Sequence, residues 1–293
     1  MLTTLLLLQA AAHSPAITPK SPGEIVAQAP AADWVDIAPD DLLVMRLAPD
    51  RDGKARRVVI QLMPPPFSQP WIANIHTLAR AHWWDGTSIN RVQDNYVVQW
   101  GDATEKKPLP AGMKATSQND YTSRAGVFPT SGPRRDPYAD ARPYKGWPIA
   151  SDGQVGWPVH CYGMIGVGRD MPPSAGNGTE LYTVIGHAPR HLDRNIALIG
   201  RVVEGIENLS SLPRGTGNLG FYEKPEQRVP IVSIRMASEL PEAERPHLQY
   251  LSTESPSFAA YADARANRRD AFFIVPAGGA DICNVPVPIR KKP

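Results

Sequence analysis

Short hydrophobic runs separated by turn residues recur along the middle of the chain. Two of them, residues 42–47 and 57–62, flank a charged turn that contains Gly53, which predicts a β-hairpin. Strands are also predicted over the following runs: 89–92, 96–98, 163–169, 180–186, 197–203 and 228–236. About eight closely spaced strands favour a closed antiparallel barrel or a sandwich.

Helical spacing appears in only a few places. Trp71, Ile75 and Leu78 lie on one face of a helix predicted over residues 70–81, with Pro70 in its first turn. A short helix is predicted over 206–212. Another helix is predicted from Ser255, which is suited to capping its N-terminus, to about residue 269. We therefore predict a mainly β protein with a few helices.

The pattern divides the chain into three parts. Residues 1–33 are rich in Pro, Ala and Ser and predict a signal-like, disordered lead. Residues 34–239 contain the predicted strands and form the main domain. Within it, residues 103–158 are long, polar and poor in periodicity, so we expect an enlarged loop, either functional or disordered. Residues 240–293 are a C-terminal extension that we expect to pack on the domain.

Composition narrows the classes of partner. The formal net charge is only +2, so we expect no nucleic-acid surface. No stretch approaches the ~20 apolar residues that a membrane-spanning helix needs. Proline is abundant, 31 of 293 residues, against a typical share of ~5%, which favours short elements and long connections.

The N-terminus and the two cysteines bear on location. The leucines at 5–8 and the alanines at 10–12 resemble the end of a secretory signal, although no basic residue precedes them. We expect a periplasmic or secreted protein, with a disordered tail on a cytoplasmic protein as the alternative. In an exported protein Cys161 and Cys283 can form a disulfide. Two separate buried thiols are the alternative.

Three segments, in order, resemble the cyclophilins: VVIQLMPPPFSQPWIANIHTLARAHWWDGTSINRVQDNYVVQWGD (58–102), HCYGMIGVGR (160–169) and ELYTVIGHAPRHLDRNIALIGRVVEGIENL (180–209). The resemblance runs from about residue 42 to residue 236. It implies an eight-stranded antiparallel β-barrel capped by helices, with peptidyl-prolyl cis–trans isomerase activity. The expected partners are proline-containing polypeptides, and the reaction needs no metal or organic cofactor. We expect a monomer.

The resemblance also assigns site residues. Arg91 stands at the family's catalytic arginine, and Gln99 at the glutamine that holds the peptide backbone. A guanidinium near the prolyl nitrogen stabilises the twisted amide more than either planar form. The other positions assigned to substrate binding are Tyr96, Val97, Gly168, Arg169, Glu180, Tyr182, His191 and Leu192. Without the resemblance, Arg91 reads as a surface arginine on a strand.

Several positions depart from the family pattern. Asn90 replaces a histidine, Trp100 a glycine, Tyr182 a phenylalanine and His191 a tryptophan. Glu180 replaces a glutamine, and its carboxylate is expected to compete for Arg91. Together with the long loop and the extension, these changes motivate an alternative function: a non-catalytic cyclophilin-like module that binds a protein partner.

Overall fold

Eight antiparallel strands close into a barrel in the computed structural model, which describes residues 19–124 and 138–293. The order around the barrel is β10-β5-β4-β12-β2-β3-β11-β9, and β9 pairs with β10 to close it. The barrel strands are β2 (Leu42–Leu47), β3 (Arg56–Leu62), β4 (Ser88–Val92), β5 (Val97–Gly101), β9 (Met164–Val167), β10 (Leu181–Val184), β11 (Leu198–Glu204) and β12 (Val229–Met236). The closed barrel expected from the sequence is confirmed.

A barrel strand is hydrophobic on both faces where another segment of the chain packs against its outer face. Along β2, Leu43 and Met45 belong to the core inside the barrel. Leu42 and Val44 point the other way and pack in a second cluster with Leu248 of the C-terminal extension. The near-continuous run LLVMRL is therefore explained by burial on both faces, rather than the alternation of a half-exposed strand.

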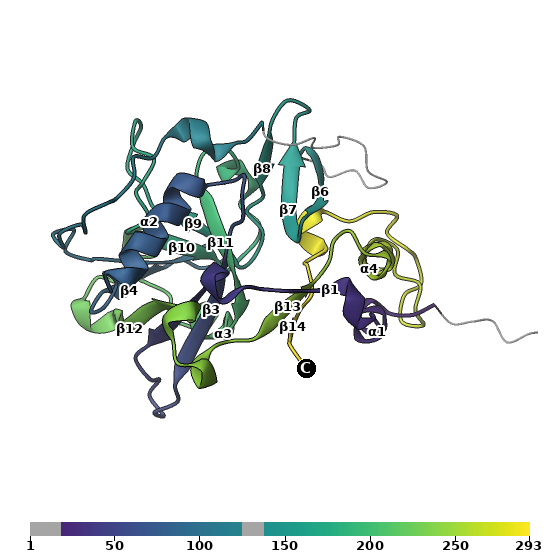
Figure 1. The fold of residues 1–293 in the computed structure, drawn as a ribbon, viewed down its shortest axis with the longest axis horizontal. Coiled ribbons are helices and arrows are strands. Elements are labelled where there is room, and N and C mark those ends of the chain that lie inside the picture. Colours follow the sequence, from purple (N-terminus) through teal and green to yellow (C-terminus); the bar gives the residue numbers. More distant parts are fainter. Residues whose placement is uncertain (1–18, 125–137) are drawn as a thin grey trace, which may run out of the picture.

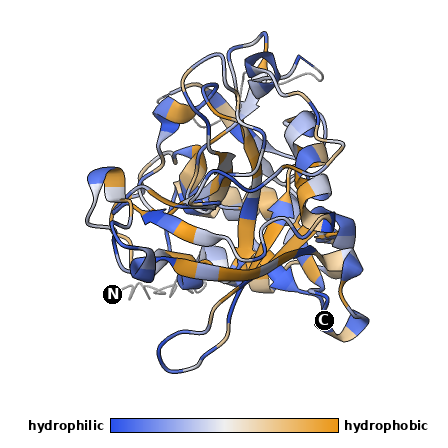
Figure 2. Cartoon of the chain, turned by 90° about the vertical axis from the view of Figure 1, so that its left-hand side faces the viewer, coloured by the Kyte–Doolittle hydropathy of each residue, from blue (hydrophilic) through white to orange (hydrophobic). Residues whose placement is uncertain are grey.

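Helix α2 (Gln69–Arg80) packs on the barrel through the predicted face. Trp71, Ile75 and Leu78 are completely buried there, and the indole of Trp71 donates a hydrogen bond to the carbonyl of Gly176. Helix α3 (Glu207–Ser210) is a single turn after β11. In Figure 2 the barrel strands are largely hydrophobic, and the loops that project from them are mostly hydrophilic.

Single turns of 3-10 helix occur between these elements. They are η1 (Ala31–Asp33), η2 (Pro39–Asp41), η3 (Gln118–Tyr121), η4 (Arg190–Leu192), η5 (Asn218–Gly220), η6 (Pro225–Gln227), η7 (Ala237–Glu239), η8 (Glu242–Glu244) and η9 (Ile282–Asn284). Across residues 19–124 and 138–293, no helix is both long and apolar enough to cross a membrane.

The two ends of the chain build a small lobe beside the barrel. A three-stranded sheet has the order β1-β13-β14, and helices α1 and α4 lie next to it (Figure 1). Its elements are α1 (Pro22–Ala27), β1 (Trp34–Asp36), β13 (Leu248–Leu251), α4 (Pro256–Ala266) and β14 (Ile289–Lys291). Ser255 caps α4 as predicted, its side chain accepting a hydrogen bond from the Phe258 N–H.

The disordered lead predicted over residues 1–33 is wrong for its second half. Ser21 and Glu24 form a capping box at the start of α1, and Ile25 and Val26 pack against the hydrophobic cluster of the lobe. A helix this short is unstable alone, so its partner α4, more than two hundred residues away, stabilises it. The signal-like run at residues 5–12 lies outside the described residues.

The enlarged loop contains a sheet that the sequence did not predict. Strands β6 (Asp140–Tyr144), β7 (Trp147–Ser151) and β8 (Gly156–Pro158) pair in that order. Arg201 of β11 anchors them, because its buried guanidinium lies 4.4 Å from the Trp147 ring centroid and donates to the Gly146 carbonyl at 2.7 Å. Burial lowers the pKa of Arg201 to about 10.

Candidate functional site

Three neighbouring strands place the central predicted residues in one row. Arg91 of β4 pairs with Gln99 of β5, and Gln99 pairs with Tyr182 of β10. Residues paired across antiparallel strands have their side chains about 5 Å apart at Cβ. The register of the barrel therefore brings together residues that are distant in the sequence.

A β-bulge at Asn90 precedes the arginine. The pairing of β4 with β5 shifts between Ile89 and Arg91, so Asn90 has no partner of its own in the ladder. Its side-chain amide instead donates to the Gly101 carbonyl at 3.1 Å, and the Ser88 hydroxyl donates to its oxygen at 2.6 Å. Bulges redirect neighbouring side chains, and this one sets the direction of Arg91.

A small cavity of about 130 Å³ lies beside this row. Its buried apolar part comes from Val97 and Tyr182, which pack with Val184. The lining residues are Arg91, Tyr96, Val97, Gln99, Gly168, Arg169, Tyr182, Leu192 and Ile196. Eight of the ten substrate residues expected from the sequence thus line one cavity.

The guanidinium of Arg91 is held by three acceptors. Its Nε donates to the Leu219 carbonyl at 2.6 Å and one Nη donates to Gln99 Oε1 at 2.9 Å, while the other Nη donates to the side chain of Gln93. The rings of Tyr96 and Phe221 lie 5.6 and 5.4 Å from its central carbon. Burial lowers the pKa of Arg91, which still leaves the side chain protonated at neutral pH.

Glu180 does not compete for Arg91 as the sequence suggests. Within the described residues, the acceptors of Arg91 do not include the Glu180 carboxylate. Burial raises the pKa of Glu180. Gln99 accepts from Arg91 through its side-chain oxygen. Glu180 lines a second, larger cavity of about 590 Å³ that adjoins the first at Gly168 and Arg169.

Three further predicted residues, His191, Arg169 and Gly168, make contacts within the protein. His191 is exposed and stacks on Tyr96, with ring centroids 6.4 Å apart. Arg169 is fixed by hydrogen bonds to the carbonyls of Asn195 and Asp170. The Gly168 N–H already donates to the Glu180 carbonyl at 2.8 Å, so this N–H does not pair with a substrate strand.

Four residues of the site were missed. Ile196 lines the cavity, and Gln93, Leu219 and Phe221 contact Arg91. Gln93 directly follows β4, and its spacing of two from Arg91 was an available signal. Leu219 and Phe221 come from a loop more than a hundred residues away, and no sequence pattern connects them to Arg91.

The two cysteines, Cys161 and Cys283, form a disulfide, with 5.1 Å between their Cα atoms. The bond joins η9 of the extension to the segment before β9. Of the two alternatives raised by the sequence, the disulfide is the one that the structure contains.

The site is thus a closed antiparallel barrel that carries an arginine and an amide beside a small cavity with a buried apolar part. Residues 57–236 match the family described as cyclophilin type peptidyl-prolyl cis-trans isomerase/CLD. The match covers more than half of the chain, and the protein belongs to this family.

Two similar proteins extend the comparison. Peptidyl-prolyl cis-trans isomerase CYP23 of Arabidopsis thaliana is 38% identical over 76 residues, which cover 25% of this chain and 32% of that relative, so the match spans about a third of its length. The crystal structure of cyclophilin AquaCyp293 from Hirschia baltica matches with a TM-score of 0.64 and 22% identity, over 89% of this chain and 94% of that one. The shared fold thus extends beyond the segment that the family matches.

Proposed function

We propose that the protein is a peptidyl-prolyl cis–trans isomerase that acts on Xaa-Pro bonds of polypeptide clients and assists their folding. Family membership supports this function. The observation that carries the proposal is Arg91, whose guanidinium is fixed by three acceptors at the edge of an apolar cavity.

The reaction is a rotation, so the chain needs to stabilise only a twisted amide. The barrier to rotation is ~18–20 kcal/mol because the planar amide is conjugated. Twisting localises a lone pair on the prolyl nitrogen, which then accepts a hydrogen bond that the planar amide cannot accept. Three of the five N–H groups of an arginine are used in holding Arg91, which leaves N–H groups of its Nη atoms for this nitrogen.

The neighbouring residues hold the substrate in place. The proline ring occupies the cavity between Val97, Tyr182 and Leu192, where it is shielded from water. Gln99 keeps Arg91 oriented and lies where the resemblance places a contact to the peptide backbone. Since these donors are fixed before the substrate binds, they need no reorganisation during the rotation.

The test is the isomerisation rate of a Xaa-Pro peptide. We expect Arg91→Ala to lower kcat/KM by about 10²–10³-fold, the usual cost of removing one donor to the transition state. Arg91→Lys should recover little, because a lysine cannot donate to three acceptors in a plane. Arg46→Ala is the matched control, since Arg46 is an exposed arginine of β2 that pairs with Glu244 away from the cavity. Equal rates for the wild type and Arg91→Ala would contradict the proposal.

A non-catalytic binding module is the second candidate. The observation that favours it is Gly168, whose N–H already donates to the Glu180 carbonyl at 2.8 Å and so does not pair with a substrate strand. This candidate requires saturable binding of a Xaa-Pro peptide without acceleration of its isomerisation. Titration and kinetics on the same sample separate the two functions.

We also propose that the protein is exported to the periplasm or secreted and acts as a monomer. The Cys161–Cys283 disulfide supports export, because such bonds persist in oxidising compartments and are rare in the cytosol. Cell fractionation and light scattering test the two statements, and a cytoplasmic, reduced protein would contradict the first.

A further inference from the structure

The floor of the cavity carries a buried hydroxyl. Tyr182 is only 5% exposed, and its hydroxyl oxygen lies 2.9 Å from Nε2 of His160, which is completely buried. A Cβ atom added to Gly166 would lie 2.3 Å from both Cζ and the hydroxyl oxygen of Tyr182. The tyrosine ring therefore lies directly over Gly166 of β9, in space that only a glycine leaves open.

Asp193 determines which nitrogen of His160 carries the proton. Oδ1 of Asp193 accepts hydrogen bonds from the backbone N–H of His160 at 3.0 Å and from Nδ1 of its ring at 2.9 Å. Because Nδ1 donates to a carboxylate, Nε2 is the unprotonated nitrogen of the neutral ring. Burial lowers the pKa of His160, which favours this neutral form. The Tyr182 hydroxyl is then the donor and Nε2 the acceptor.

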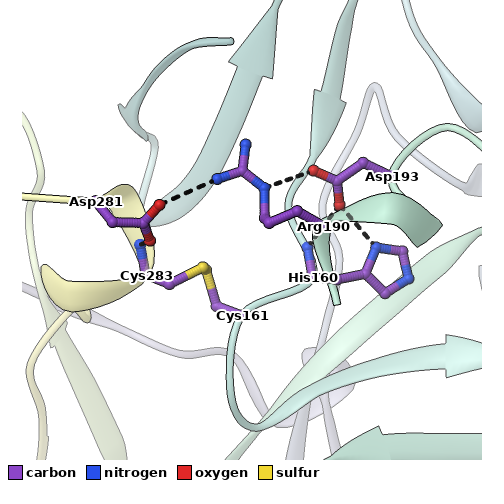
Figure 3. Close-up of a disulfide and its surroundings, with 6 residues drawn as sticks. All are labelled: His160, Cys161, Arg190, Asp193, Asp281 and Cys283. Atoms are coloured by element: carbon purple, nitrogen blue, oxygen red, sulfur yellow. Dashed lines mark hydrogen bonds and ion pairs between the residues drawn. A yellow bond between two sulfur atoms is a disulfide. The ribbon is translucent and has the colours of Figure 1, made fainter. Parts of the chain in front are cut away.

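Arg190 holds Asp193 in turn. Its Nε donates to Asp193 Oδ2 at 2.8 Å, and its Nη1 lies 3.4 Å from Asp281 of the C-terminal extension. Figure 3 shows Arg190 between these two carboxylates, with the Cys161–Cys283 disulfide beside them. Both oxygens of Asp193 are thus used, and the carboxylate has little freedom to release the histidine.

We propose that His160 is a positioning residue of the proline pocket, which acts through the hydroxyl of Tyr182, and that Asp193 and Arg190 set its orientation. The inference rests on the proposed function, which assigns the cavity to the proline ring. It gives a role to a histidine that contacts neither Arg91 nor the cavity.

The physical reason lies in the free energy that it costs to bury the tyrosine hydroxyl without a hydrogen-bond partner. A hydroxyl buried without a partner is strongly unfavourable, so an unpaired Tyr182 would turn its ring to reach water or the substrate. His160 removes this cost and fixes the ring over Gly166. Tyr182 is also the register partner of Gln99, so a displaced ring would disturb the row that ends at Arg91.

A double-mutant cycle with His160→Asn and Tyr182→Phe tests the inference in the full-length oxidised protein. Asparagine can still donate to Asp193 but is too short to reach Tyr182. We expect His160→Asn to raise the KM for a Xaa-Pro peptide about fivefold or more, with a smaller change in kcat, because a pocket wall binds the planar and twisted forms alike. In the Tyr182→Phe background the same substitution should change KM by less than about twofold.

His247→Asn, at an exposed histidine, is the control and should leave KM unchanged. A purely structural role for His160 would reduce the fraction of folded enzyme, and so lower kcat without changing KM. Additive effects in the cycle would overturn the inference while leaving the proposed function intact. A wild-type protein that neither binds nor isomerises the peptide would overturn both.

The ¹⁵N chemical shifts of the imidazole rings, measured by NMR, provide a second test, which does not require a substitution of His160. We expect the wild-type ring of His160 to be neutral near pH 7, with the proton on Nδ1 and an Nε2 signal typical of a hydrogen-bond acceptor. Tyr182→Phe should shift the Nε2 signal toward that of a free nitrogen. A proton on Nε2 in the wild type would contradict the proposed arrangement.

Discussion

Removal of the disulfide is the perturbation whose effect can be worked out most directly. Cys161 and Cys283 are separated by 122 positions in the sequence. In the chain-entropy model, a cross-link that closes a loop of this length stabilises the native state by about 5 kcal/mol, because it restricts the unfolded chain. Domains of ordinary size are stable by only about 5–15 kcal/mol, so the double variant Cys161→Ala/Cys283→Ala should lose a large part of its stability.

Urea unfolding followed by tryptophan fluorescence measures this loss. Given a slope of about 2–3 kcal/mol per molar urea, the midpoint of the double variant should lie about 2 M below that of the oxidised wild type. Wild type reduced with a phosphine is the matched control, because it lacks the cross-link but keeps both sulfur atoms. It should unfold at nearly the same midpoint as the double variant.

Two results would refute this reasoning. A midpoint within about 0.3 M of the oxidised wild type would mean that the cross-link does not restrict the unfolded chain as the model requires. A low midpoint for the double variant but not for the reduced wild type would assign the loss to packing around the sulfur atoms.

Three further predictions concern buried groups. Because burial lowers the pKa of His160, the unfolded chain binds a proton below about pH 6.5 that the native state does not bind. The free energy of unfolding should therefore fall toward acid pH more steeply in the wild type than in His160→Gln, by up to ~1.4 kcal/mol per pH unit. Urea titrations between about pH 5 and pH 7 measure this difference. Gly166→Ala places a methyl group against the ring of Tyr182 and should cost about 1–3 kcal/mol of stability and weaken binding of a Xaa-Pro peptide; unchanged binding would show that the ring tolerates displacement. Arg201→Met removes the donor to the Gly146 carbonyl and should lower the free energy of unfolding by about 1–3 kcal/mol, with faster amide hydrogen exchange confined to β6–β8. Exchange that is equally faster across the barrel would contradict the role of Arg201 as an anchor of that sheet.

Strands and helices could be predicted from the sequence where their buried residues recur with a simple period. The stripe of Trp71, Ile75 and Leu78 on α2 and the cap at Ser255 are examples, since both depend on residues within a few positions of one another. The sheet β6–β8 was not readable, because its strands contain Pro143, Pro148 and Pro158 and have no regular alternation. A buried arginine of β11 anchors this sheet, and such a contact leaves no local signal.

The site shows the same division. The family resemblance placed Arg91, Gln99 and Tyr182 in one pocket, and the strand register brings them into a row. It also suggested that Glu180 competes for Arg91, whereas the acceptors of Arg91 in the structure are Leu219, Gln99 and Gln93. The spacing of charged residues along the chain cannot distinguish these two arrangements, because they differ only in which side-chain atoms meet.

By itself, the sequence determined that this is a mainly β protein with about eight short strands, because hydrophobic period and turn residues act over short distances. The cyclophilin barrel was implied by the resemblance of three segments to that family. Only the tertiary structure decided how distant segments complete it. The N-terminal helix α1 is stable because it packs against the cluster of α4, and Arg91 is oriented by Leu219 and Phe221. Tyr182 is held by His160, whose ring is in turn held by Asp193. The contacts of Arg91 and Tyr182 depend on the closure of the barrel and that of α1 on the packing of the two chain ends, and both bring together residues that are far apart in the chain.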